Sequence, residues 1–181
     1  MHELAQRLDR SVVLIGHMGV GKSTVGRRLA RTLGLPFVDS DTAIEEAAGL
    51  SAAELFERWG EEAYRYGERQ LVARLVEGEI RVIATGGGAF IDPSTRDLLN
   101  NRTITIWLDA PIDLLVSRVT QADTRPLLRN SNPKATLERL AKERKPSYSS
   151  AHIHVKCGDD PASDVVELIL RELERHCSMP R

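Results

Sequence analysis

The sequence predicts an α/β fold, a three-layer α/β/α sandwich built on a five-stranded parallel sheet. Short runs rich in β-branched residues alternate along the chain with longer stretches of helical periodicity, an order typical of parallel sheets wrapped by helices. A glycine-rich loop follows the first run directly and opens a helical stretch, as in phosphate-binding proteins of this class. The five predicted strands cover residues 11–15, 37–38, 81–84, 103–108 and 153–155.

Several helix boundaries follow from local patterns. Apolar side chains recur every four residues over residues 25–33, and a glycine then ends that pattern. Ser51 followed three residues later by Glu54 is a capping-box signature. Asp160 before Pro161 predicts a further helix start, with an aspartate cap and proline at the first helical position.

Residues 121–134 break this order because they are polar and contain two prolines. We interpret this stretch as a mobile lid. The sequence shows no internal repeat, low-complexity tract or interdomain linker, so we predict a single domain over residues 1–181.

Charge and composition exclude several classes of protein. The 25 Lys and Arg residues nearly balance the 26 Asp and Glu residues, and a net charge of -1 gives no reason to expect binding to nucleic acid or to a membrane surface. No apolar run approaches the roughly 20 residues of a membrane-spanning helix. Two cysteines are too few for a disulfide framework, and the first residues carry charges where a signal peptide needs an apolar core. We expect a cytoplasmic protein that acts as a monomer.

Residues 16–23 read Gly-His-Met-Gly-Val-Gly-Lys-Ser and match the spacing of a phosphate-binding loop, or P-loop. Glycines let the backbone curl so that N–H groups point at phosphate oxygens, above the positive end of the helix dipole. We expect Lys22 to reach the β- and γ-phosphates and Ser23 to bind Mg²⁺. The predicted nucleotide-binding residues of the loop are Gly19, Val20, Gly21, Lys22, Ser23 and Thr24.

A P-loop alone does not show how the nucleotide is used, so the function must be inferred from other residues, first those that follow the next two strands. Asp39 and Asp41 follow the second strand, at the sheet edge where ligands of such folds bind. They can serve a metal and an acceptor. Three consecutive glycines at residues 86–88 follow the third strand and allow a ligand to lie against the bare backbone.

Three arginines lie outside any basic run: Arg65, Arg125 and Arg144. A guanidinium suits bidentate capture of a carboxylate or phosphate. These arginines therefore imply an anionic acceptor, and the sequence predicts a small-molecule kinase. Arg125 falls in the predicted lid, where the alternative interpretation is a surface side chain.

Taken together, the motifs resemble the shikimate kinases, within the nucleoside-monophosphate-kinase-like group of P-loop proteins. The resemblance runs from about Val12 to Leu173. It implies transfer of the γ-phosphoryl group of ATP to the 3-hydroxyl of shikimate, in the pathway to chorismate and the aromatic amino acids. The motifs that carry it are residues 16–24, 39–41, 56–65 (Phe-Glu-Arg-Trp-Gly-Glu-Glu-Ala-Tyr-Arg), 86–88, 125–128 (Arg-Pro-Leu-Leu) and 143–148 (Glu-Arg-Lys-Pro-Ser-Tyr).

The same resemblance implies roles on the acceptor side. Arg65 and Arg144 would pair with the carboxylate of shikimate, and Asp41 would contact its hydroxyls and act as the base. Glu61 would orient Arg65, within a helical acceptor-binding region at about residues 41–77. The implied substrate-binding residues are Asp41, Arg65, Gly86, Gly87, Gly88 and Arg144.

On the nucleotide side, the resemblance implies that Asp39 holds one Mg²⁺ through water and that Arg118 stacks on adenine. Arg125 would contact the transferring phosphate from the lid, which makes Lys22, Asp41 and Arg125 the predicted catalytic residues. Asp159-Asp160-Pro161 departs from the family pattern, because relatives often carry a basic residue before a proline beside adenine.

Alternatives to these interpretations stay open. The chain could phosphorylate another small anionic polyol such as gluconate, or it could be a non-catalytic nucleotide-binding regulator. Asp41 could cap the helix that follows it instead of acting in catalysis. Trp59 and Trp107 are expected to be packing residues.

Overall fold

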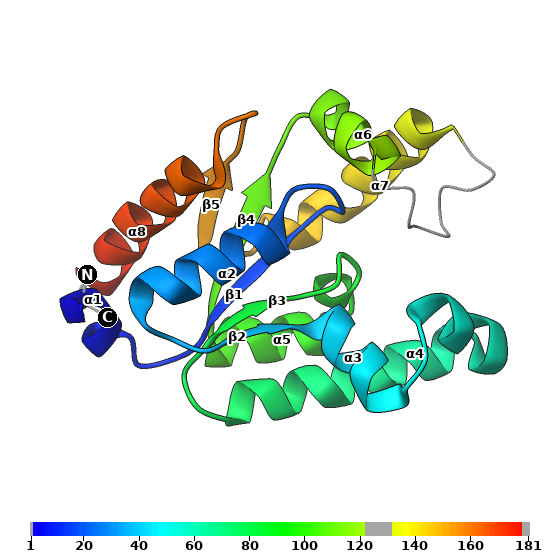
Figure 1. Cartoon of the computed structure of the whole chain (residues 1–181), viewed down its shortest axis with the longest axis horizontal. Helices are drawn as coiled ribbons and strands as arrows, with labels where there is room; N and C mark the ends of the chain where they lie inside the picture. The colour runs from blue at the N-terminus through cyan, green and yellow to red at the C-terminus, as the bar shows by residue number, and fades with distance from the viewer. Residues whose placement is uncertain (1, 122–131, 179–181) are drawn as a thin grey trace.

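The computed structural model describes residues 2–121 and 132–178. Within these residues, five strands form one parallel sheet in the order β2-β3-β1-β4-β5 (Figure 1). Each observed strand agrees with its predicted range to within one residue, so the predicted five-stranded parallel sheet is confirmed. The strands are β1 (Val12–Gly16), β2 (Phe37–Asp39), β3 (Val82–Ala84), β4 (Ile104–Asp109) and β5 (Ile153–Lys156).

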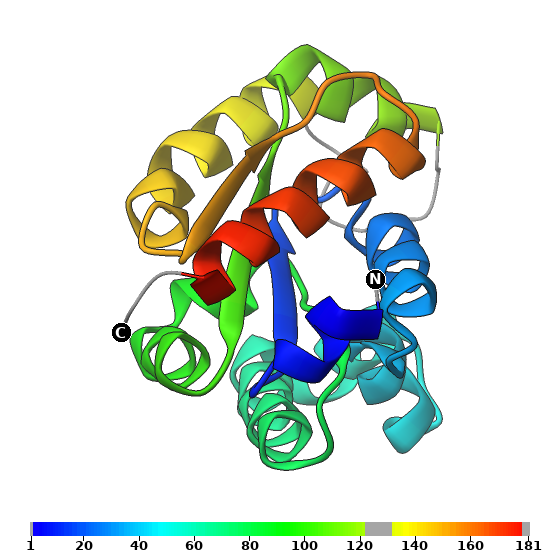
Figure 2. The same ribbon diagram turned by 90° about the vertical axis from the view of Figure 1, so that its left-hand side faces the viewer.

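Helices cover both faces of the sheet, which confirms the three-layer architecture. Alternate residues of β1 point to opposite layers, Leu14 into one hydrophobic cluster and Ile15 into the other. The Leu14 cluster contains side chains of α1 (His2–Arg7), α2 (Lys22–Leu33) and α8 (Ala162–Ser178), and Figure 2 shows α1 and α8 over this face. The Ile15 cluster contains side chains of α4 (Ala52–Glu77), α5 (Pro93–Arg102) and α7 (Pro133–Tyr148).

The start of α4 confirms the predicted capping box. The side chain of Ser51 accepts a hydrogen bond from the backbone N–H of Glu54, whose carboxylate accepts from the backbone N–H of Ser51. Further along α4, Gly60 has φ 79° and ψ 171°, a conformation that breaks the helix into two pieces. The remaining helices are α3 (Ser40–Ala48), α6 (Ile112–Gln121) and the short 3₁₀ helix η1 (Ala89–Ile91).

The predicted start of α8 is wrong by one position. Pro161 precedes the helix, and its carbonyl accepts hydrogen bonds from the backbone N–H groups of Asp164 and Val165. The carboxylate of Asp160 accepts from the backbone N–H of Gly158. Asp160 therefore orders the β5–α8 loop, which belongs to the site described below.

Most of the predicted lid lies outside the described residues, since only positions 121 and 132–134 of the stretch are included. Asn132 accepts hydrogen bonds from Lys134 and Ala135 and so caps α7. Across the described part of the chain, the helices lack an apolar stretch long enough to cross a bilayer. The single-domain organisation stays a prediction.

Candidate active site

The loops that follow β1, β2 and β3 meet at the carboxyl edge of the sheet. Their convergence follows from the strand order, because β3 lies between β2 and β1 and its Ala84 is in register with both Asp39 and Leu14. The P-loop, the Asp39–Asp41 segment and the three glycines therefore face one another. The loops after β4 and β5 lie on the other side of β1, and such a crevice is where ligands of open parallel sheets bind.

The P-loop has the curled backbone that its glycines predict. Gly21 adopts φ 94°, in the left-handed region, and stands at the N-terminus of α2. The Nζ of Lys22 donates hydrogen bonds to the carbonyl oxygens of Gly16 at 2.9 Å and His17 at 3.0 Å. The ammonium group is thus held across the loop at the positive end of a helix, an arrangement that favours phosphate binding.

Asp39 links the P-loop to the start of α3. Its Oδ2 accepts a hydrogen bond from the Ser23 hydroxyl at 2.5 Å, and its Oδ1 accepts one from the backbone N–H of Asp41 at 3.1 Å. Asp39 is therefore the residue that caps α3, and the alternative in which Asp41 is the cap is wrong. Asp41 lines a hollow of about 220 Å³ together with Lys22, Ser23, Asp39 and Gly87.

Behind Asp41, a buried carboxylate pairs with Arg65. The Oε2 of Glu68 lies 2.8 Å from the Nη1 of Arg65, and the Glu68 side chain is only 3% exposed. Glu61 also reaches Arg65, at 3.5 Å, but its side chain is 70% exposed, so Glu68 is the stronger partner. A Cβ added to Gly86 would lie 2.5 Å from Asp41 Oδ1 and 2.7 Å from Glu68 Oε1, so both carboxylates lie on the side of this glycine where a side chain would point.

The pKa values of Glu68 and Arg65 are shifted by burial and by the ion pair between them. Burial raises the pKa of Glu68, the charge of Asp41 acts in the same direction, and Arg65 opposes both. Burial also disfavours the charged form of Arg65, but the hydrogen bond and charge of Glu68 hold the pKa of Arg65 above its ordinary value. Arg65 therefore stays cationic and is oriented by a carboxylate that contacts little solvent.

On the opposite wall, α7 approaches the glycine loop. The Nη1 of Arg144 donates to the carbonyl oxygen of Gly87 at 2.9 Å, and the hydroxyl of Tyr148 donates to the same oxygen at 2.5 Å. Tyr148 is fully buried, and burial raises the pKa of its hydroxyl, so the group remains a donor. A single carbonyl thus fixes an arginine and a tyrosine that are one helical turn apart.

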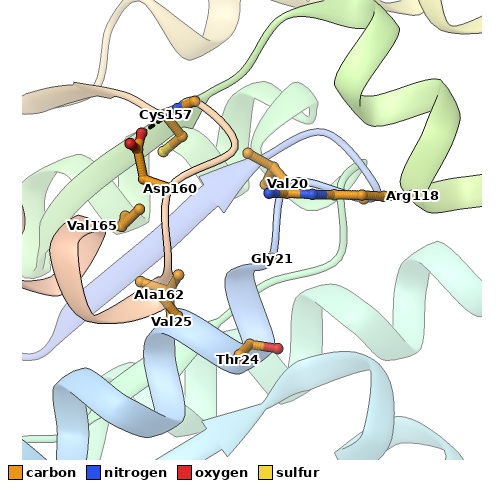
Figure 3. Close-up of a pocket in the computed structure, with 11 residues that line it drawn as sticks. Val20, Gly21, Thr24, Val25, Arg118, Cys157, Asp160, Ala162 and Val165 are labelled. Carbon is orange, nitrogen blue, oxygen red and sulfur yellow. Dashed lines mark hydrogen bonds between the residues drawn. The ribbon is translucent and has the colours of Figure 1, made fainter.

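A second hollow, also of about 220 Å³, opens on the β4–β5 side of the P-loop (Figure 3). Arg118 extends into it from α6 toward Val20, and its Nη2 lies 3.2 Å from Oδ1 of Asp159. Cys157 lines the opposite wall, where burial raises the pKa of its thiol to about 11 and keeps it protonated. The hollow has one cationic edge and largely apolar walls, which suits a flat base such as adenine.

The two tryptophans differ in environment. Trp107 is 5% exposed, as expected of a packing residue. Trp59 is 55% exposed, so the prediction that it is a packing residue is wrong.

Arg125, the predicted catalytic arginine of the lid, lies outside the described residues.

A family model for shikimate kinase matches residues 18–174 of the chain. The chain is 48% identical over 173 residues to the shikimate kinase of Caulobacter vibrioides, covering 96% of this chain and 86% of the relative. The chain belongs to the shikimate kinase family.

Solved structures agree with membership of the shikimate kinases. The shikimate kinase from Acinetobacter baumannii, solved in complex with shikimate, has a TM-score of 0.90 and 36% identity, covering 94% of this chain and 96% of that one. A gluconokinase from Sinorhizobium meliloti has a TM-score of 0.63 at 18% identity, covering 94% of this chain and 95% of that one. The second likeness shows a shared fold alone.

Two residues that make contacts in this site were given no role in the sequence analysis. Glu68 stands three positions after Arg65, a spacing that brings side chains together on a helix, so this signal was present in the sequence. Tyr148 meets Gly87 across 61 positions of the chain, and nothing local indicates that contact.

Proposed function

We propose that the chain transfers the γ-phosphoryl group of ATP to the 3-hydroxyl of shikimate. The observation that carries the proposal is the shared hollow, lined both by the P-loop residues Lys22 and Ser23 and by Asp41 and Gly87 from the adjacent loops. A phosphate donor and a hydroxyl acceptor that both bind in this hollow would be in direct contact, with no protein segment between them. Holding the two reactants side by side in this way is a major contribution to the catalysis of phosphoryl transfer.

On the donor side, we assign the phosphates to the P-loop. The backbone from Gly19 to Thr24 and the N-terminus of α2 supply inward N–H groups, and Lys22 supplies a positive charge that is already held over the loop. The adenine base belongs in the hollow beside Arg118, whose guanidinium can stack on a ring once it leaves Asp159.

The residues around Ser23 fit a single Mg²⁺ ion. Mg²⁺ prefers oxygen ligands and keeps several waters, and the Ser23 hydroxyl and Asp39 carboxylate are oxygen donors that already meet at 2.5 Å. Among residues 2–121 and 132–178, no group of three or more His, Cys, Asp or Glu side chains could hold a metal without help from a ligand. Phosphate oxygens and water would have to complete the shell. When bound, the ion would offset negative charge on the phosphates.

On the acceptor side, we assign the carboxylate of shikimate to Arg65 and Arg144, which enter from α4 and α7 on either side of the glycine loop. A Cβ added to Gly88 would lie 2.7 Å from Arg65 Nη1, and one added to Gly87 would lie 3.2 Å from Arg144 Nη1. The glycines thus leave room for both guanidinium groups beside the backbone. Two cations beside adjacent residues of one loop favour an anionic acceptor over a neutral sugar.

Asp41 would accept the proton of the attacking hydroxyl as transfer proceeds. Asp41 lines the shared hollow, and its backbone is fixed by the cap that Asp39 provides. Lys22 would stabilise negative charge on the moving group, and Arg125 would add a second cation from the lid. The acceptor is therefore held by residues of α3, α4 and α7, and the donor by the loop after β1.

A coupled assay for ADP release tests this function. Wild-type protein is expected to release ADP in the presence of shikimate, Mg²⁺ and ATP, and to turn over gluconate far more slowly. Equal turnover of gluconate would favour the alternative polyol kinase, and no acceptor-dependent release would favour a non-catalytic nucleotide-binding protein. Asp41→Asn should lower kcat by about 100-fold or more, since general bases contribute about 10²–10⁴-fold. Undiminished turnover in this variant would remove Asp41 from the mechanism.

The monomeric state and the cytoplasmic location that we expect from the sequence stay predictions. Light scattering on the purified chain, with and without substrates, measures the first. Fractionation of the source cells measures the second.

A further inference from the structure

His17 belongs to the P-loop, yet its side chain turns toward the acceptor side of the site. The ring is 5% exposed and meets the ring of Tyr148 edge-on, with centroids 5.0 Å apart and planes at 79°. His17 does not line the phosphate hollow or the base hollow described above. No hydrogen bond joins its Nδ1 to another described residue, so the ring acts there by packing.

Tyr148 connects the His17 ring to the acceptor site. Its hydroxyl and the Arg144 guanidinium share the carbonyl oxygen of Gly87 as their acceptor. Gly87 in turn rests on the P-loop, since a Cβ added to it would lie 3.4 Å from the Gly16 oxygen. The P-loop, the glycine loop and α7 therefore form one junction, and the His17 ring fills the space between the P-loop and α7.

The backbone of the same residue holds the donor side. The carbonyl oxygen of His17 accepts a hydrogen bond from Lys22 Nζ at 3.0 Å. Burial and the charges of Arg144 on α7 and Lys22 on α2 lower the pKa of the His17 ring to about 4, against a smaller opposing effect of Asp109 on β4. The ring is neutral near pH 7 and can lie beside both cations without repelling them.

We propose that His17 is a positioning residue for acceptor binding, whose ring holds Tyr148 and, through it, the guanidinium of Arg144 in place to receive the shikimate carboxylate. The inference rests on the proposed function, because it assumes that Arg144 binds this carboxylate. It assigns a role in acceptor affinity to a side chain of the nucleotide-binding loop.

Steady-state kinetics of three His17 variants test the proposal. His17→Ala removes the ring and should raise the KM for shikimate by about 2- to 12-fold, the range expected for loss of one edge-to-face aromatic pair. The KM for ATP should change by less than about twofold. His17→Phe keeps a ring edge and should restore the KM for shikimate, and His17→Leu, which fills part of the space, should give an intermediate value.

Two further measurements separate positioning from loss of stability. Val166→Ala truncates a buried side chain on α8, in the cluster on the opposite face of the sheet, and should lower the Tm while leaving the KM for shikimate unchanged. Tyr148→Phe cuts the link to Gly87 but keeps the ring. In that background His17→Ala should add little to the KM for shikimate, because the two changes break the same chain of contacts.

The possible outcomes are distinct. An unchanged KM for shikimate in folded His17→Ala, an equal or larger rise in the KM for ATP, or full additivity with Tyr148→Phe would each overturn the positioning role. If His17→Ala does not fold, a His17→Phe protein with a wild-type Tm but a raised KM for shikimate would overturn it. Wild-type protein that does not use shikimate would contradict the proposed function itself, a result visible before any variant is made.

Discussion

Replacing Gly88 by alanine puts a methyl group where the Arg65 guanidinium lies. The new Cβ would be 2.7, 2.9 and 3.0 Å from Nη1, Nη2 and Cζ of Arg65, and the first two distances are closer than real Cβ contacts allow. The backbone of Gly88, at φ -98° and ψ -20°, suits alanine without strain. The substitution therefore displaces the end of one flexible side chain while leaving the loop in place.

The expected effect falls on acceptor affinity and, through the broken ion pair with Glu68, on stability. Charge-assisted hydrogen bonds are each worth about 1.5–3 kcal/mol, so a guanidinium moved off the shikimate carboxylate should raise the KM for shikimate by about 10- to 150-fold. The Arg65 side chain is 30% exposed and can swing into solvent. Burial raises the pKa of the Glu68 that it leaves behind, and a buried carboxyl group that has lost its cation costs stability, so the Tm should fall as well.

Initial rates of ADP release at varied shikimate and ATP measure the effect, with thermal unfolding to confirm the fold. Gly67→Ala is the matched control: it lies in α4, and beyond its chain neighbours and the backbone of its own helix nothing lies within 4 Å of the added Cβ. It should leave the KM for shikimate unchanged while adding up to about 1 kcal/mol of helix stability. A KM for shikimate within twofold of wild type in folded Gly88→Ala would refute the role given to Arg65, and so would an equal rise in the control.

Three further predictions concern other parts of the molecule. The pKa of His17 is lowered to about 4 in the folded protein from an ordinary 6.5, so the unfolded chain takes up the proton first and stability falls as the pH drops from about 6.5 toward 4. Urea unfolding across this window should show wild type losing up to roughly 3 kcal/mol more than His17→Phe, and equal slopes would contradict the assignment. Asp39→Asn should raise the Mg²⁺ concentration needed for half-maximal rate by about 10-fold or more, measured by Mg²⁺ titration at fixed ATP, and an unchanged titration would remove Asp39 from the metal site. Ser51→Ala removes the capping box of α4 and should cost about 0.5–2 kcal/mol in the free energy of unfolding, with Glu57→Ala, an exposed position before the break at Gly60, as the control. Equal losses in both variants would argue against the cap.

Features that depend on neighbouring residues were predictable from the sequence. The P-loop is a contiguous motif whose glycine positions alone specify its backbone, and the Ser51–Glu54 capping box closes within one helical turn. Sequence spacing does not decide whether Glu61 or Glu68 is the main partner of Arg65, because both stand about one helical turn from it. Burial decided between them, and burial depends on which elements pack over the helix.

Contacts between distant segments needed the tertiary structure. Trp59 lies in a motif of the family, yet it points to solvent, since the segment before the break at Gly60 places it on an open face. The meeting of Tyr148 with Gly87 joins α7 to the loop after β3, and no periodicity in either segment indicates that pairing.

The sequence by itself determined the chemistry available to this protein: a P-loop to hold phosphates, acidic residues after the second strand, and arginines for an anionic acceptor. Only the tertiary structure decided how these groups are distributed around the P-loop. The order β2-β3-β1-β4-β5 puts the acceptor loops on one side of β1 and the base hollow on the other, so the P-loop lies between donor base and acceptor. Strand order follows from which apolar faces of distant helices and strands bury one another, and that long-range packing leaves no local signature in the chain.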